Sequence, residues 1–327
     1  MNNPLSKEII EEISGELGVN PAFIEKDWYV VKLIRALEQK EFNGYKPVFA
    51  GGTSLSKGYD LIQRFSEDLD FKFIGALSLT REQRRNIRNS FIDCIKEISD
   101  FKIANDNIKV RNEGKNCCIY VEYPHNPDLP QFLRPFLQVE IFFDDENLTY
   151  ESRKIQSFVS KYINNAPETS INCILPFNTG ADKFNALSWR IYNKEKATDY
   201  TLLRHLHDLY AIRMYLKDTT AFKNRVIYNF ETKDKPRLHN NDLKFKDIVL
   251  GTLEMLTTDK SFRKGYEDYV EVMSYAPLAH RIKFDDALDF YKRKLFGIFC
   301  GLTLVILVLS VFVPKNSYAN QENDKNK

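Results

Sequence analysis

Apolar residues recur at helical spacing through the beginning of the chain. One set runs from Ile9 to Leu17 and a second from Phe23 to Leu37, with Gly18 and Pro21 between them. Residues three or four positions apart share one face of an α-helix, and glycine and proline commonly separate helices. The pattern therefore predicts two helices before the first strand.

The pattern changes from helical to extended after Pro47. A short apolar run, Val48-Phe49-Ala50, ends in Gly51-Gly52 and is followed by apolar residues at helix-like intervals up to Ile62. The next segment, Asp68–Ile74, alternates between charged and apolar residues, which is the two-residue period of a strand. These segments predict a strand, a tight turn, a helix and a second strand whose two aspartates share one face.

The remaining elements follow from the same two periods. A charged helix is expected near Arg81–Ile98, and from Ala181 to about Phe290 the period is mainly helical. Three more strands are expected between them, at Ile108–Arg111, Cys117–Tyr123 and Phe136–Phe143. We therefore expect an α+β protein, with a mixed sheet and flanking helices in residues 1–175 and a helical domain in residues 176–291.

The last part of the chain, residues 292–327, begins with an uncharged apolar segment. Leu295–Val313 follows the basic residues Lys292-Arg293-Lys294 and precedes a polar tail. As a helix rising about 1.5 Å per residue, the segment would nearly cross a hydrocarbon core of about 30 Å and leave the preceding part of the chain in the cytoplasm. A buried core helix has the same composition. The segment therefore predicts either a tail anchor on the inner face of the cell membrane or a core helix.

Charge and cysteine content limit the class of protein. The net charge is only +2 over 327 residues, so any surface that binds phosphate groups must be local. The five cysteines lack CxxC spacing, and we expect reduced thiols in a cytoplasmic protein. His205 and His207 are two residues apart on a predicted helix and do not face one another, which argues against a zinc site.

The turn at Gly51-Gly52 has the features of a phosphate-binding loop. Glycine lets the backbone approach phosphate oxygens closely, and Thr53 adds a hydroxyl and an amide at a helix start, where the dipole favours anions. Lys57, one turn further on, would add a positive charge near the same phosphates. A Gly-Gly-Thr sequence also occurs in ordinary strand-to-helix turns, so its meaning depends on what lies beside it.

Two carboxylates follow the turn at a spacing that suits metal ions. Asp68 and Asp70 are one residue apart on a strand, so both project to the same side and can bind Mg²⁺ in a two-metal site. We expect Glu140, charged among apolar neighbours, to supply the third carboxylate in preference to Asp144 or Asp145. A solvated edge strand is the alternative. The turn and the two aspartates together are a more specific signal than either alone. Only one helix separates them in the sequence, so they can meet at one end of adjacent strands.

Together these residues resemble a known family. The stretch Phe49–Tyr59, followed by Arg64-Phe65-Ser66-Glu67-Asp68-Leu69-Asp70, is similar to the first motif of the nucleotidyltransferase toxins of the AbiEii/AbiGii type, in the DNA polymerase β-like superfamily. Ala181–Leu187 and Arg204–Tyr210 resemble two later motifs of that family, which carry a lysine and an aspartate. The resemblance covers roughly residues 25–213.

The resemblance implies an enzyme that uses Mg²⁺ to transfer a nucleoside monophosphate from an NTP to an acceptor. The catalytic residues that it implies are Asp68, Asp70, Lys183 and Asp208, and the nucleotide-binding residues are Gly51, Gly52, Thr53, Lys57 and Arg64. Lys183 would bind the phosphates of the nucleotide, and Asp208 would position the catalytic groups. From the residues alone, a solvated surface lysine is the alternative for Lys183, and a hydrogen-bond partner between helices is the alternative for Asp208.

The resemblance also implies the role of a toxin in a toxin–antitoxin or phage-defence system, with a cognate antitoxin encoded nearby. Some members modify the 3′ end of tRNA, and an RNA acceptor needs a local basic surface. Four basic residues share one face of a predicted helix and are a candidate for this surface: Arg81, Arg84, Arg85 and Arg88. The alternative is that they are only a solvated helix face. Two other functions remain open, a nucleotidyltransferase with a protein or small-molecule acceptor and a catalytically silent, membrane-tethered nucleotide-binding protein.

Overall fold

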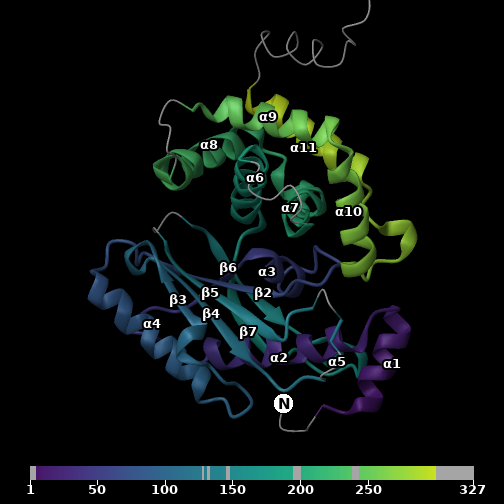
Figure 1. The fold of residues 1–327 in the computed structure, drawn as a ribbon. Coiled ribbons are helices and arrows are strands. Elements are labelled where there is room, and N and C mark those ends of the chain that lie inside the picture. Colours follow the sequence, from purple (N-terminus) through teal and green to yellow (C-terminus); the bar gives the residue numbers. More distant parts are fainter. Residues whose placement is uncertain are drawn as a thin grey trace, which may run out of the picture. The chain divides into compact units, whose positions relative to one another are not determined.

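The described strands form one mixed seven-stranded sheet with the order β3-β4-β5-β2-β1-β7-β6 (Figure 1). The structure is a computed structural model and describes residues 5–126, 129–130, 133–144, 148–193, 200–237 and 243–299. The strands are β1 (Val48–Ala50), β2 (Asp68–Ile74), β3 (Ile108–Arg111), β4 (Asn116–Glu122), β5 (Phe136–Asp144), β6 (Tyr150–Ile155) and β7 (Thr169–Ile174). The helices are α1 (Lys7–Leu17), α2 (Pro21–Glu38), α3 (Gly51–Lys57), α4 (Arg81–Lys96), α5 (Phe158–Tyr162), α6 (Pro176–Tyr192), α7 (Tyr200–Ala211), α8 (Thr219–Asn229), α9 (Phe245–Thr258), α10 (Lys260–Met273) and α11 (Phe284–Ile298). The expected α+β class with a mixed sheet is confirmed.

The chain divides into two compact units. The first comprises residues up to Gly180 together with Tyr269–Arg281, and it contains the sheet and helices α1 to α5. The second comprises Ala181–Asp268 and the residues from Ile282 on, and its described elements are helical. The division falls inside α6 and α10, whereas the sequence pattern placed a boundary near Pro176. The sequence pattern did not predict that Tyr269–Arg281 would belong to the first unit.

Alternating side chains give the sheet an apolar face and a polar face. On the apolar face, Phe71 and Phe73 of β2 contact Phe91 of α4, with ring centroids 5.6 Å and 6.0 Å apart. The opposite face of β2 carries Asp68 and Asp70, because successive side chains of a strand point to opposite sides. The predicted strand Asp68–Ile74 is therefore confirmed, and its aspartates lie on the polar face.

Two strands that the sequence pattern did not indicate complete the sheet. β7 pairs with β1 in parallel through Phe49 and Cys173, and β6 pairs with β7 at the edge. β6 shows no apolar alternation because most of its side chains are exposed, including Tyr150 at 47%. As a result, β1 is an interior strand between β2 and β7, and the Gly51 turn follows the end of this interior strand.

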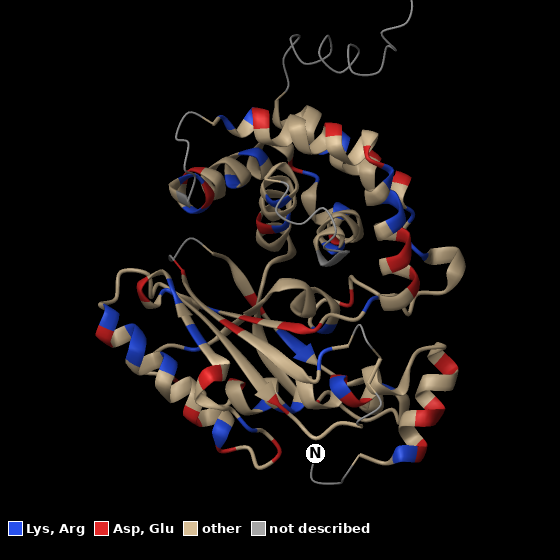
Figure 2. Cartoon of the chain, in the orientation of Figure 1, with Lys and Arg blue, Asp and Glu red and all other residues tan. Residues whose placement is uncertain are grey.

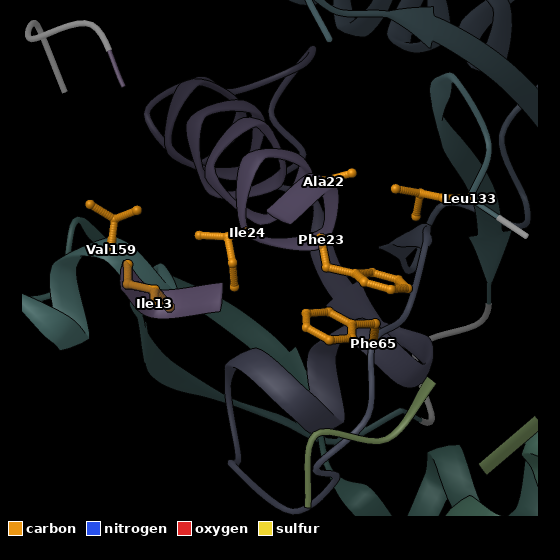
Figure 3. Close-up of a cluster of buried hydrophobic side chains, with 7 residues drawn as sticks. All are labelled: Ile13, Ala22, Phe23, Ile24, Phe65, Leu133 and Val159. Atoms are coloured by element: carbon orange, nitrogen blue, oxygen red, sulfur yellow. The ribbon is translucent and has the colours of Figure 1, made fainter. Parts of the chain in front are cut away.

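A cluster of buried apolar side chains joins α1, α2 and α5 to the loop before β2. Figure 3 shows Phe23 of α2 facing Phe65, and the two rings stack with centroids 4.1 Å apart. The same loop is held from a second direction, because the Phe65 amide donates to the Met273 carbonyl at 2.9 Å and the Tyr275 amide to the Gln63 carbonyl at 3.2 Å. The loop that leads into Asp68 is therefore fixed by packing and by backbone hydrogen bonds.

The described cysteines are buried free thiols: Cys94, Cys117, Cys118 and Cys173. Burial raises the pKa of Cys117 to about 11 and that of Cys173 to about 12, so both stay protonated near neutral pH. Cys117 and Cys118 are neighbours in β4 and point to opposite faces of the sheet.

The beginning of the apolar segment 295–313 belongs to α11. Leu295 and Ile298 are fully buried in the second unit, so these residues form part of a packed helix and the expectation of an anchor beginning at Leu295 is corrected. The segment from Cys300 on lies outside the described residues. Among the residues that are described, no helix has both the length and the apolar character required to cross a membrane.

Candidate active site

Three carboxylates come together on the polar face of the sheet. β2 pairs in parallel with β5, and in this register Asp70 lies opposite Glu140 while Asp68 lies opposite Gln138. Paired residues on neighbouring strands, about 4.8 Å apart, share a face, so Asp68, Asp70 and Glu140 occupy one small area. Asp68 is buried, and the other two are partly exposed. The structure thus brings together all three predicted metal ligands.

The two alternatives to Glu140 are not part of this group. Asp144, at the end of β5, forms an ion pair with Lys72 at 3.2 Å, and both side chains are 10% exposed. Asp145 lies outside the described residues.

The Gly51 turn lies directly against Asp70. β1 runs antiparallel to β2 with Ala50 opposite Asp70, and Gly51 begins α3 with a φ of +73°, in the left-handed region that favours glycine. A Cβ at Gly51 would lie 1.8 Å from Asp70 Oδ2 and 2.8 Å from Asp70 Cγ. Only glycine therefore allows both the turn and the carboxylate to keep their places.

The next residues of the turn hold α3 on β2. Gly52 and Thr53 are buried, and the Thr53 hydroxyl donates to the backbone carbonyl of Asp68 at 2.5 Å. This hydrogen bond ties the first turn of α3 to the residue that carries the first aspartate. The predicted Gly51-Gly52-Thr53 motif is thus in contact with the predicted carboxylates.

The structure does not bring Lys57 to this group. Its ammonium forms a buried ion pair with Asp27 of α2 and lies 4.1 Å from the centroid of the Phe158 ring. Lys57 is the last residue of α3, about 9 Å along the helix from Gly51. We therefore correct the expectation that Lys57 faces the phosphates, because its charge is taken up in joining α3 to α2 and α5.

Arg64 also makes contacts within the first unit. It is 2% exposed, donates from Nη1 to the Phe65 carbonyl at 2.8 Å and lies 5.9 Å from the centroid of the Tyr269 ring. These contacts stabilise the loop before β2. A contact between Arg64 and a nucleotide remains a prediction.

A charged network that sequence reasoning missed contacts Asp68, and its members Lys26 and Glu67 are buried. The Lys26 ammonium contacts Glu67 at 2.7 Å, and Glu67 accepts the Arg134 amide at 2.9 Å. Arg134 in turn donates from Nη1 to Asp68 Oδ1 at 3.0 Å and to Gln138 Oε1 at 2.5 Å. Burial lowers the pKa of Lys26, and the contact with Glu67 opposes that effect. The network holds the Asp68 side chain, whereas Thr53 holds its backbone carbonyl.

The three carboxylates fit a divalent cation by their chemistry, because carboxylate oxygens are the donors that Mg²⁺ prefers. Asp68 contacts Arg134, and Glu140 Oε1 accepts a hydrogen bond from Gln138 Nε2 at 2.6 Å. Within the part of the chain that the structure describes, no three His, Cys, Asp or Glu side chains are gathered as a preformed metal site. A cation bound by Asp68 would share this carboxylate with Arg134, whose Nη1 contacts Oδ1.

In the second unit, the two later motif residues contact each other. Lys183 of α6 and Asp208 of α7 form an ion pair with a distance of 2.6 Å, and their side chains are 7% and 0% exposed. His207 Nδ1 lies 3.3 Å from Asp208 Oδ1. Burial, and then the nearby Lys183 charge, lower the pKa of His205, which is therefore neutral at physiological pH. The pair joins two helices that the sequence motifs identified separately.

The four arginines of α4 do not form one exposed surface. Arg81 and Arg85 are exposed, but Arg84 and Arg88 are 6% and 8% exposed. Arg84 donates to the backbone carbonyls of Leu79 and Glu113. Basic residues do recur along α4 (Figure 2), yet the expectation of a four-residue RNA-binding stripe is wrong because two of its members face the protein.

The match of the sequence to a family model shows that this protein is a nucleotidyltransferase. Its sequence matches the family described as nucleotidyl transferase AbiEii toxin of the type IV toxin–antitoxin systems over residues 34–290. The chain therefore belongs to this toxin family, and membership implies an NTP substrate and a cognate antitoxin.

A solved structure supports the same fold. The chain is similar to MenT4, a nucleotidyltransferase toxin from Mycobacterium tuberculosis H37Rv, with a TM-score of 0.54 and 15% sequence identity. The similarity covers 94% of this chain and 98% of MenT4. A comparison with curated proteins gives no match.

Proposed function

We propose that this toxin transfers a nucleoside monophosphate from an NTP to the 3′ end of an RNA such as tRNA, in a reaction that needs Mg²⁺. The observation that carries the proposal is the register that places Asp70 beside Glu140, with Gly51 in contact with Asp70. The acceptor hydroxyl would form a bond to the α-phosphorus as the bond to the β-phosphate breaks and pyrophosphate leaves.

Each residue has a role in this reaction. Asp68, Asp70 and Glu140 would hold the cations, which when bound would neutralise the triphosphate. The glycines of the turn would let backbone amides approach phosphate oxygens. Lys183 would contribute a positive charge to the nucleotide phosphates, and Asp208 would hold its ammonium in place through the ion pair.

The test is incubation of the full chain with each α-³²P-labelled NTP, Mg²⁺ and total tRNA. Label on RNA should disappear with EDTA and in Asp68→Asn and Asp70→Asn, each of which removes a negative charge at constant size. Asp60→Asn is the matched control, because Asp60 is an exposed partner of Lys161 in the same unit and should transfer at the normal rate. If label enters protein or a small molecule, the RNA acceptor is wrong. If no NTP gives any transfer by the folded protein, a silent nucleotide-binding role replaces catalysis.

Removal of Arg134 should strengthen metal binding. In Arg134→Gln no guanidinium competes with the metal ion for Asp68. We therefore expect Mn²⁺ to bind about threefold to tenfold more tightly to this variant than to the wild type, as measured by calorimetry without nucleotide. Arg153→Gln is the control, because Arg153 is also partly exposed and pairs with a carboxylate, Glu151, at 3.6 Å. Weaker or unchanged Mn²⁺ binding in Arg134→Gln would show that Arg134 does not compete with the cation.

A further inference from the structure

The polar face of the sheet continues past the carboxylates toward the edge strand β3. Glu140 of β5 lies opposite Cys118 of β4, and Cys118 lies opposite Lys109 of β3. In the neighbouring row, Gln138 lies opposite Tyr120. Residues that are paired in this way share a face, so Lys109 and Tyr120 stand on the same side of the sheet as Asp68 and Asp70.

Basic and aromatic side chains are combined on this part of the face. The Lys109 ammonium lies 4.8 Å from the centroid of the Tyr120 ring, and Tyr120 meets Phe136 edge to face with centroids 4.9 Å apart. Lys109 and Arg111 are exposed, and both aromatic rings are partly exposed. We call Lys109, Arg111, Tyr120 and Phe136 the edge platform.

The edge platform is close enough to the carboxylates to serve the same substrate. At about 4.8 Å per strand, Lys109 lies three strands or about 14 Å from Asp70, and Tyr120 lies two strands or about 10 Å from Asp68. Among the residues of β3 and β4, one is acidic: Glu122, which shares this face and accepts a hydrogen bond from Asn107 at 3.3 Å. The two cations therefore give this area a small positive excess, within reach of a chain whose end is at the carboxylates.

We propose that the edge platform binds the single-stranded end of the acceptor RNA, with bases stacked on Tyr120 and Phe136 and phosphates paired with Lys109 and Arg111. Single-stranded nucleic acids are bound by this combination, because every base has a face that stacks on an aromatic ring and every phosphate attracts a cation. The inference rests on the proposed RNA acceptor. It moves the RNA contact from α4, where Arg84 and Arg88 are buried, to β3, β4 and β5.

The test measures binding of a fluorescein-labelled single-stranded RNA of about 12 nucleotides to the full chain by anisotropy at several salt concentrations. Lys109→Ala/Arg111→Ala should weaken binding about tenfold or more and lower the slope of log affinity against log salt by about 1.4, which is two phosphate contacts. Arg81→Ala/Arg85→Ala removes the same charge from the exposed residues of α4 and should change the affinity less than twofold.

A second set of variants separates stacking from support of the edge strand. Tyr120→Phe keeps the ring and should bind normally, whereas Tyr120→Leu keeps apolar volume without the ring and should bind about tenfold more weakly with an unchanged melting temperature. In the transfer assay, Lys109→Ala/Arg111→Ala and Tyr120→Leu should each have a higher KM for RNA than the wild type. Their kcat and their affinity for NTP should be unchanged.

The outcomes distinguish this inference from the proposed function. It is overturned if the wild type binds no RNA, if the α4 variant loses as much affinity as the β3 variant, or if Tyr120→Leu binds normally. If the wild type binds RNA through the edge platform but transfers no label, the inference stands and the proposed reaction fails. If label is transferred with the same KM by wild type and variants, the reaction stands and the edge platform is not its RNA site.

Discussion

Replacement of Gly51 by alanine is expected to lower nucleotidyl transfer at least about 100-fold in a protein that still folds. The added Cβ would lie 1.8 Å from Asp70 Oδ2, so the carboxylate has to rotate away from its present place. A displacement of about 1 Å at a reacting group commonly costs this much rate. Initial rates with saturating NTP and acceptor, together with the melting temperature, measure the effect.

Gly75→Ala is the matched control for this prediction. Gly75 follows β2 in the same unit and has a φ of +75°, almost the same as the +73° of Gly51, but a Cβ there would meet nothing within 4 Å. Both variants therefore carry the same backbone strain, about 1 to 3 kcal/mol, and only Gly51→Ala displaces a carboxylate. Equal rates for the two variants would show that the contact between Gly51 and Asp70 has no part in catalysis.

Sequence reasoning reached Asp70 and Glu140 because each has a local signal. Asp70 belongs to an alternating segment, and Glu140 is a charged residue within a strand of apolar neighbours. Their direct pairing across β2 and β5 is not local, since it depends on where two strands 70 residues apart come into register. The pattern thus identified the candidates, and the topology brings them together.

The network around Asp68 had no signal that a single sequence could provide. Lys26 and Glu67 are 41 residues apart, and Arg134 is 67 residues from Glu67. None of the three interrupts a hydrophobic pattern in a way that indicates a partner. Such residues become visible only when the fold places them in contact, and the same holds for β7, which enters the sheet beside β1.

For α4, the sequence did contain a signal that the basic spacing obscured. Arg84 and Arg88 lie three positions before Ile87 and Phe91, and these four residues share one buried face of the helix. Long arginine side chains can line an apolar face while the guanidinium finds backbone carbonyls, as Arg84 does. A stripe of like charges should therefore be compared with the apolar face of its helix before it is assigned to a surface.

Asp208→Ala is expected to destabilise the second unit by about 3 to 5 kcal/mol, because it leaves the Lys183 ammonium buried without its carboxylate. Urea unfolding followed by fluorescence measures this change. The chain has two tryptophans, Trp28 in α2 and Trp189 in α6, so a Trp28→Phe background leaves Trp189 as the reporter of the second unit. Unfolding at the same urea concentration as in that background would mean that the pair does not stabilise the unit.

The double variant Lys183→Met/Asp208→Leu separates stability from catalysis. Replacement of a buried ion pair by apolar residues of similar size is often neutral, so the double variant should be more stable than Asp208→Ala. It should nevertheless transfer no nucleotide, since the positive charge assigned to the phosphates is gone. A folded double variant that is still active would remove Lys183 from the catalytic residues and leave the pair as a contact between α6 and α7. A folded but inactive variant would show that the charge, which is costly to bury, is kept for the reaction.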